Sequence, residues 1–286
     1  MDVILVRYAE VGLKSRGVRT RFEKVLMDNM LTLLARDGIE ALVRCDQGRI
    51  YVETGQVERA CTTLRRVFGI ASVSPAWSSA SDMKTMRERV AAIATTALAD
   101  GSTFKIEARR TGTHPYTSMD AARSLGEAVL MAHEGRGVRV DIHRPDRTIW
   151  VEIRDDKAFM FTDYLEGPAG LPMGSQGRVL ALLERDRDAV AAWLIMKRGC
   201  KVIALVGGES DALRTVRRWD PEMRAEPKGD LEQQLRFHRA SALVLGYGIE
   251  DMDLIRQVKV NAPVFYPIVG MSPEEIAERF AKISKA

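Results

Sequence analysis

Apolar and polar residues follow two distinct periods along the first part of the chain. The run VILVR at 3–7 has the length and composition of a strand, whereas residues 16–36 place apolar side chains three and four positions apart, as an amphipathic helix does. The same pattern predicts strands at 40–44, 49–53 and 70–73, a turn at 46–48, and a helix over 57–67 that stops at Gly69. This strand–helix–strand–strand–helix–strand order is typical of the ferredoxin-like fold.

A second group of elements follows and ends in a connector. The pattern predicts helices at 82–99 and 117–132 and strands at 103–109, 138–142, 148–154 and 157–161. Residues 167–177 read GPAGLPMGSQG, with four glycines and two prolines. Such a segment is typical of a connector with fixed bends.

Beyond the connector, short apolar strands alternate with helices. Strands are expected near 178–183, 201–206, 242–246 and 263–265, and helices near 187–198, 209–218, 230–240, 250–258 and 273–284. Strands that are separated by helices form a parallel sheet covered on both faces. The sequence therefore predicts a Rossmann-like α/β domain at this end.

Composition narrows the class of protein. The chain has 286 residues, of which 46% are hydrophobic, enough for two or three domains. No run of about 18 apolar residues occurs, and the opening MDVILVRYAEV reads as a strand, so we expect a cytoplasmic protein without a membrane span or signal peptide. Cys45, Cys61 and Cys200 lack CxxC spacing and the histidines are scattered, so neither disulfides nor a metal site are expected. The net charge is only +4, so an argument for nucleic-acid binding must rest on local clusters.

Four stretches resemble one family, the bacterial and archaeal tRNA 4-thiouridine synthetases, or tRNA sulfurtransferases. They are RYAEVGLKSRGVRTRFEKVLMDN (7–29), TFKIEARRTGTHPYTSMDAARSLGEAVL (103–130), GPAGLPMGSQGRVLALL (167–183) with AAWLIMKRGC (191–200), and PVFYPIVGMSPEEIAERFAKIS (263–284). The resemblance implies an α+β ferredoxin-like domain at 1–75, a THUMP RNA-binding domain at 76–166, a linker at 167–177, and an α/β PP-loop ATP-pyrophosphatase-like domain at 178–286.

The chain departs from this family at three places. The family's SGGxDS turn, which cradles the pyrophosphate of ATP, corresponds to Glu184–Ala189, which has no glycine. Each acid there would repel a phosphate charge by about 4 kcal/mol at 4 Å and an effective dielectric near 20. Of the family motif TGESxGQVASQT only Gly246 is retained, and we expect no catalytic cysteine, since the sequence stops at Ala286 and Cys200 matches a structural position. The resemblance therefore implies a degenerate PP-loop without catalytic residues.

Two groups of residues are candidates for RNA contact. By the resemblance, the first two domains together hold the acceptor region of tRNA, including its 3′ end. Lysine and arginine bind phosphates, and a helix N-terminus adds N–H donors. The candidates are Lys14, Arg16, Arg19, Arg21, Arg109, Arg110, His114, Ser118 and Arg123. The alternatives are a solvated charged face for the cations, a turn role for His114 and an N-cap role for Ser118.

Residual nucleotide binding is a weaker hypothesis. Gly207, Gly208 and Gly246 follow predicted strands at the carboxyl edge of the sheet, where open α/β sheets bind ligands, although such turns also need glycine for geometry alone. Arg185 and Arg187 would offset the negative charge of the turn. The acids near these positions fit helix starts better than a magnesium site.

The sequence leads to one hypothesis and two alternatives. The first is a tRNA-binding protein that neither adenylates nor thiolates tRNA, needs no cofactor, forms a homodimer as the family does, and presents tRNA to a separate modifying enzyme. The second is an active tRNA sulfurtransferase that uses ATP and Mg²⁺ through a remodelled loop and takes sulfur from a separate donor. The third is an interaction scaffold for another tRNA-modifying protein.

Overall fold

The computed structural model describes residues 1–46 and 48–285. The turn expected at 46–48 includes Gln47, which lies outside the described residues. The chain divides into two compact units: the first holds Met1–Leu5, Tyr51–Cys61 and Ser74–Leu165, and the second holds Val6–Ile50, Thr62–Val73 and the residues from Glu166 onward. Within the described residues, no helix is both long and apolar enough to span a membrane.

The N-terminal elements follow the ferredoxin-like order that the sequence predicts. They are β1 (Val3–Tyr8), the 3₁₀ helix η1 (Glu10–Leu13), α1 (Arg16–Arg36), β2 (Leu42–Asp46), β3 (Arg49–Glu53), α2 (Val57–Leu64) and β4 (Ile70–Ala80). The strands pair in the order β2-β3-β1-β4. Helix α1 buries Phe22, Leu26, Met30, Leu33 and Leu34, so its apolar face is the one that the helical spacing indicates.

Strand β4 is longer than expected. The strand predicted at 70–73 continues through Pro75 and three serines to Ala80. The reason is tertiary: Trp77 to Ala80 pair with β8 (Lys157–Phe161), a partner about eighty residues away in the sequence. Proline has no backbone N–H to donate, so local residue preferences indicate that the strand ends near Pro75. Pairing of the following residues with β8 nevertheless extends the strand, because tertiary context can override these preferences.

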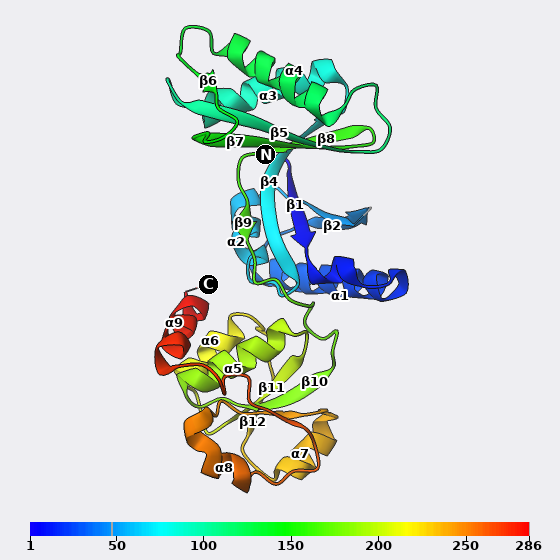
Figure 1. Cartoon of the computed structure of the whole chain (residues 1–286). Coiled ribbons are helices and arrows are strands. Elements are labelled where there is room, and N and C mark those ends of the chain that lie inside the picture. Colours follow the sequence, from blue (N-terminus) through cyan, green and yellow to red (C-terminus); the bar gives the residue numbers. More distant parts are fainter. Residues whose placement is uncertain (47, 286) are drawn as a thin grey trace. The chain divides into compact units, whose positions relative to one another are not determined.

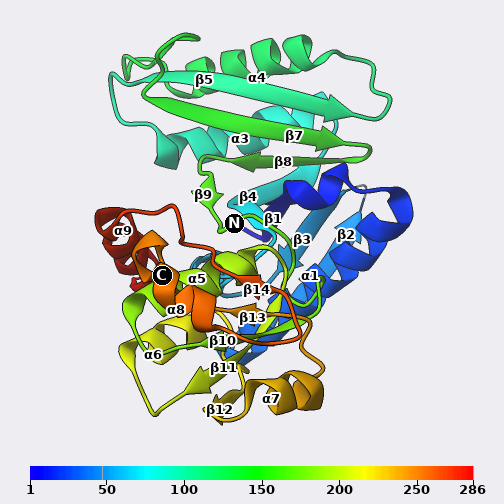
Figure 2. The same ribbon diagram turned by 60° about the horizontal axis from the view of Figure 1, so that its bottom comes forward.

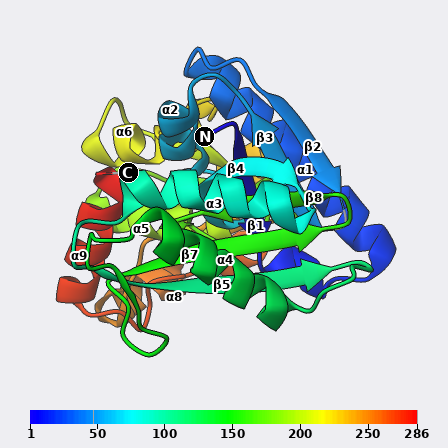
Figure 3. The same ribbon diagram turned by 90° about the horizontal axis from the view of Figure 1, so that it is seen from above.

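The THUMP segment forms a sheet covered by two helices. Its elements are α3 (Met83–Ala97), β5 (Thr103–Thr111), α4 (Ser118–Ala132), β6 (Arg139–Val140), β7 (Arg147–Arg154), β8 and β9 (Leu165–Glu166). The strand order is β4-β8-β7-β5-β6, with β5 parallel to β7 and β7 antiparallel to β8. Helices α3 and α4 lie side by side on one face (Figures 1 and 3) and bury Met86, Val90, Leu125 and Val129 against it.

The C-terminal part is an α/β domain with a parallel sheet, as predicted. Its strands run in the order β12-β11-β10-β13-β14, and each pair is parallel. The strands are β10 (Arg178–Leu182), β11 (Lys201–Val206), β12 (Ala225–Pro227), β13 (Leu243–Val244) and β14 (Val264–Phe265). The sequence did not predict β12, which is an edge strand of three residues containing Pro227.

Helices cover both faces of this sheet (Figure 2). They are α5 (Asp186–Lys197), α6 (Asp211–Arg217), α7 (Leu231–His238), α8 (Met252–Gln257) and α9 (Pro273–Ser284), with the 3₁₀ helix η2 (Ile249–Asp251) before α8. One face packs on α5, α6 and α9. Phe68 joins this core beside Trp193 and Trp219, with ring centroids 5.5 and 5.3 Å away. The other face packs on α7 through Leu235.

The connector is held against the end of α5. Its Leu171 N–H donates to the Lys197 carbonyl at 2.9 Å, and Asn29 Nδ2 of α1 donates to the Met173 carbonyl at 3.0 Å. Gly170 has φ +78°, and a Cβ there would lie 2.1 Å from the Lys197 oxygen. The close approach requires glycine at this bend.

Candidate functional site

The turn between β10 and α5 lies at the carboxyl edge of the parallel sheet, where open α/β folds bind ligands. In place of glycines it carries Glu184 and Arg185, and Arg185 is the N-cap of α5. Asp186 is the first residue of the helix; burial, and then the negative charge of Asp211, raise the pKa of this carboxyl. The turn therefore concentrates charge at a position where a nucleotide-binding protein exposes backbone.

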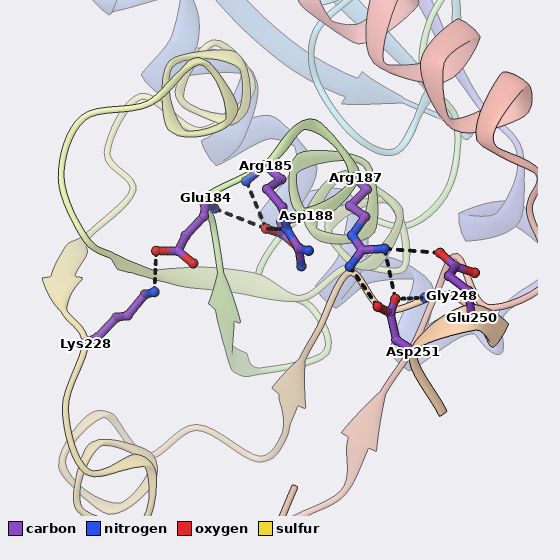
Figure 4. A network of polar contacts seen from close by, with 8 residues as sticks. All are labelled: Glu184, Arg185, Arg187, Asp188, Lys228, Gly248, Glu250 and Asp251. Atoms are coloured by element: carbon purple, nitrogen blue, oxygen red, sulfur yellow. Dashed lines mark hydrogen bonds and ion pairs between the residues drawn. The ribbon is translucent and has the colours of Figure 1, made fainter. Parts of the chain in front are cut away.

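The carboxylate of Asp188 occupies the donors of this turn (Figure 4). Only 1% of Asp188 is exposed, and its Oδ2 accepts the N–H of Glu184 at 3.2 Å and the N–H of Arg185 at 2.9 Å. The guanidinium of Arg185 reaches the same carboxylate at 3.4 Å. An internal anion thus binds the N–H groups that would otherwise face an external one.

Two of the predicted glycines lie against this turn, and the third does not contact it. A Cβ on Gly246 would lie 2.4 Å from Asp188 Oδ1 and 2.8 Å from Asp188 Cα, so this glycine makes room for the buried carboxylate. A Cβ on Gly207 would lie 3.3 Å from Glu184 Oε1, the tip of a side chain that is ion-paired with Lys228. Gly208 has open space around the corresponding position.

Arg187 points away from Asp188 toward the loop after β13 (Figure 4). Its guanidinium forms ion pairs with Asp251 at 2.9 Å and with Glu250 at 3.1 Å and lies 6.0 Å from the Tyr247 ring centroid. The Gly248 N–H also donates to Asp251 at 2.9 Å. Sequence reasoning missed these partners, because Arg187 and Asp251 are 64 residues apart and no motif connects them.

The first group of RNA candidates lies in the second unit, around the start of α1. Lys14, Arg16 and Arg21 are exposed and Arg19 is half-exposed. Within the described residues, no carboxylate forms an ion pair with any of the four. The nearby carboxylate of Glu23 instead accepts the hydroxyl of Tyr8, and burial followed by this hydrogen bond raises the pKa of Tyr8.

The second group lies in the first unit, at the end of β5 and the start of α4. Arg109 and Arg110 are exposed; Arg109 forms an ion pair with Glu107 at 3.2 Å, and Arg110 donates to the Gly112 carbonyl at 3.3 Å. His114 Nε2 lies 2.7 Å from the Asp155 carbonyl oxygen, so the structure gives this ring a role in the loop. Arg123 is exposed on α4.

The N-cap role considered for Ser118 is wrong. The N-cap of α4 is Thr117, whose hydroxyl accepts the Asp120 N–H at 3.1 Å while the Asp120 carboxylate accepts the Thr117 N–H at 3.0 Å. This reciprocal pair requires the acid three residues after the cap, and Asp120 meets that condition for Thr117. Ser118 is the first residue of the helix itself.

Comparison with known proteins identifies the family. The ThiI ferredoxin-like domain matches residues 3–74 and the THUMP domain matches residues 80–163. A probable tRNA sulfurtransferase of Methanocaldococcus jannaschii is 31% identical over an alignment of 291 positions. The alignment covers 98% of this chain and 73% of that protein. This chain is a member of the tRNA sulfurtransferase family. The family resemblance expected from the sequence is confirmed.

Coverage differs among the other proteins that this tRNA sulfurtransferase-family chain resembles. The probable tRNA sulfurtransferase of Methanosarcina acetivorans is 36% identical, over 77% of this chain and 57% of that protein. The chain thus spans little more than half of that relative. The crystal structure of PH1313 from Pyrococcus horikoshii superposes with a TM-score of 0.86 at 28% identity, covering 99% of both chains. A 4-thiouridine synthetase–RNA complex with bound ATP has the same fold, with a TM-score of 0.82 at 22% identity over 99% of this chain and 85% of that one.

Substitution of Gly246 tests how closely this residue packs against Asp188 in the turn. We expect Gly246→Ala to lower the free energy of unfolding by about 1–3 kcal/mol, because the new methyl group overlaps the backbone and carboxylate of Asp188. Gly207→Ala is the matched control, since its new methyl group meets only the flexible tip of Glu184, and its effect should be below about 0.5 kcal/mol. Urea denaturation of the parent protein and of the two variants measures both changes in the free energy of unfolding. Equal stabilities would contradict the packing at Gly246.

The Arg187–Asp251 pair should make stability depend on pH. Burial alone would raise the pKa of Asp251, but the Gly248 N–H and the Arg187 guanidinium outweigh it, so the pKa lies below its ordinary value. Such a carboxylate stabilises the fold above its unfolded pKa of about 3.9 and loses that contribution as the pH falls toward the folded pKa. We expect the protein to be more stable than Asp251→Asn above about pH 5, and the difference to shrink below about pH 4.

Asp253→Asn is the control for this measurement, because 90% of the Asp253 side chain is exposed. Its stability difference from the parent protein should be small at every pH. A difference for Asp251→Asn that grows as the pH falls would contradict the assignment.

Proposed function

We propose that this chain is a tRNA-binding member of the tRNA sulfurtransferase family that neither adenylates nor thiolates tRNA itself. The observation that carries the proposal is the β10–α5 turn, where Glu184, Arg185 and Asp186 stand at the serine and glycine positions of the SGGxDS motif. The Asp188 carboxylate engages the N–H groups of Glu184 and Arg185 at this turn. A triphosphate at this turn would approach the carboxylates of Glu184 and Asp186, and side chains occupy the space that the glycines of the motif leave open. The residues of the turn therefore do not fit ATP, and the proposal includes no ATP or Mg²⁺.

The proposal of RNA binding rests on three supports. The relatives are named tRNA sulfurtransferases, the 4-thiouridine synthetase with this fold was crystallised as an RNA complex, and this chain contains a THUMP domain. It also carries exposed cations near the start of α1 and at the end of β5. Exposed lysines and arginines without a full set of internal partners are available for phosphates. We take the acceptor region of tRNA with its 3′ end as the target and a homodimer as the assembly.

A second candidate function is an interaction scaffold for another tRNA-modifying protein. Large apolar side chains are exposed in η2 and α8, which follow β13, and at the last residue of β14. They are Ile249, Met252, Leu254 and Phe265, between 40% and 71% exposed. Exposed apolar groups of this kind favour contact with a protein partner, such as the separate enzyme that would supply the chemistry.

Binding of a tRNA transcript tests the RNA part of the proposal. We expect binding that requires the 3′ CCA end and that weakens roughly a hundredfold to five-hundredfold for a fourfold rise in salt, taking about five phosphate contacts. The double variant Arg109→Glu/Arg110→Glu should lose binding while keeping its fold, because both side chains are exposed. Filter binding and circular dichroism measure the two properties.

Arg256→Glu/Lys259→Glu is the matched control, because it makes the same change of charge at exposed positions of the C-terminal domain. It should bind tRNA nearly as well as the parent protein. Weak binding by the parent protein that ignores the CCA end would contradict the proposal and favour the scaffold.

A calorimetric titration with ATP and Mg²⁺ tests the loss of catalysis. We expect no binding at concentrations up to about 1 mM, either by the parent protein or by Arg185→Gly/Asp186→Gly, because the restored glycines leave Glu184 in the turn and do not restore the second family motif, of which only Gly246 is present. A family member with an intact SGGxDS turn is the positive control. Binding of ATP, or thiouridine formation in tRNA, would instead identify an active sulfurtransferase with a remodelled loop.

A further inference from the structure

A hollow in the second unit gathers basic side chains from three separate elements. It has a volume of about 420 Å³ and lies where the segment just after α2 meets α5 and α9. Helices α5 and α9 lie side by side (Figures 2 and 3). We call this hollow the α5–α9 groove, and its cationic lining residues are Arg65, Arg66, Lys197, Arg279, Lys282 and Lys285. Glu166 is the single acidic residue of the lining.

Most of these cations have no internal counter-ion. Within residues 1–46 and 48–285, no carboxylate forms an ion pair with Lys197, Arg279, Lys282 or Lys285. Arg66 is the exception, with Asp37 at 2.5 Å. Burial lowers the pKa of Lys197, and the positive charges of Arg279 and, less strongly, Lys282 lower it further. The negative charge of Glu10 opposes this shift. The groove therefore holds like charges close together without neutralising them.

Helix dipoles account for only part of this cluster. Lys197 and Lys282 lie in the last turns of α5 and α9, where a positive charge is favourable. The final carbonyls already have donors, however: Leu171 N–H reaches the Lys197 oxygen at 2.9 Å and Trp219 Nε1 reaches the Ile283 oxygen at 3.0 Å. Arg65 directly follows α2 and its Nε donates to the Glu166 carbonyl at 3.0 Å, whereas Arg279 lies before the last turn of α9. Helix ends and local hydrogen bonds therefore account for some of these cations and not for all of them.

The floor of the groove is apolar and aromatic. Trp193 and Trp219 line it, each 6% exposed, with ring centroids 5.4 Å apart in an edge-to-face arrangement. Lys197 Nζ lies 5.4 Å from the Trp193 ring centroid. An apolar floor lowers the local dielectric and strengthens attraction between these cations and an anion. The rings themselves are too buried to stack on a base, so the groove suits recognition of charge and not of sequence.

We propose that the α5–α9 groove is a binding site for linked phosphate groups. Arginine forks and lysine ammonium groups are the side chains that proteins use for phosphate oxygens. Arg279 and Lys282 are three residues apart on α9, so they are neighbours on its surface, and Lys285 directly follows the helix. All three line the groove, where they can contact successive phosphates. The phosphates come either from an RNA backbone or from a free phosphate chain such as that of a nucleotide. The site goes beyond the proposed function, because it is separate from the two groups of RNA candidates and from the β10–α5 turn.

Titration with inorganic tripolyphosphate tests the site directly. The groove variant is Arg279→Gln/Lys282→Gln/Lys285→Gln, and the matched control is Arg236→Gln/Arg256→Gln/Lys259→Gln, which removes the same charge from exposed positions outside the groove. Glutamine preserves helix propensity in both. Calorimetry should give binding at least about tenfold weaker for the groove variant than for the control. The proposal would be overturned if tripolyphosphate binding were weakened equally in the two variants, or if it were unchanged in the groove variant.

Binding of tRNA by the parent protein, the groove variant and the control variant distinguishes the two sources of phosphate. If the groove holds an RNA backbone, the slope of log K against log salt should fall by about 0.7–0.9 for each contact that the groove variant loses. An unchanged slope together with lost tripolyphosphate binding would assign the groove to a free phosphate chain. Arg109→Glu/Arg110→Glu should retain tripolyphosphate binding, so a failure of the RNA proposal and a failure of this site give different results.

Discussion

The buried carboxylate of Asp188 determines the character of the sheet's carboxyl edge. A carboxylate that is 1% exposed must find hydrogen-bond donors, and it finds them in the N–H groups of Glu184 and Arg185. Those groups belong to the turn at which this fold commonly receives phosphate. The need to satisfy an internal charge therefore competes with binding of an external one. Gly246 follows from the same constraint, since any side chain there would overlap Asp188.

The neighbouring Arg187 links two loops at this edge of the sheet. Arg187 has 19% of its side chain exposed and pairs with Glu250 and Asp251. These contacts tie the start of α5 to the loop after β13, which would otherwise surround a ligand in an α/β protein of this kind. Charged side chains thus link two loops across the edge, and the positive charge of Arg187 is largely neutralised within the protein.

The basic residues of the chain differ in how completely they are neutralised. Arg187 is held by two carboxylates, and Arg109 by Glu107. The cations at the start of α1 and those along α9 lie without such partners in the described part of the chain. Surface ion pairs contribute little to folding, so unpaired clusters cost little and remain available for ligands. The distribution of unpaired charge, more than the net charge of +4, separates surfaces that suit phosphates from surfaces that serve the fold.

The sequence determined the order of the elements and the family, because hydrophobic periods and local motifs depend on neighbouring residues. The helix of α1, the alternation beyond Arg178 and the segment GPAGLPMGSQG are all local patterns of this kind. Tertiary structure alone decided the extension of β4, which needs its pairing with β8, and the existence of β12, whose three residues carry no periodicity. It also decided the partners of Arg187 and the gathering of α2, α5 and α9 residues in one groove, since these residues are brought together only by folding.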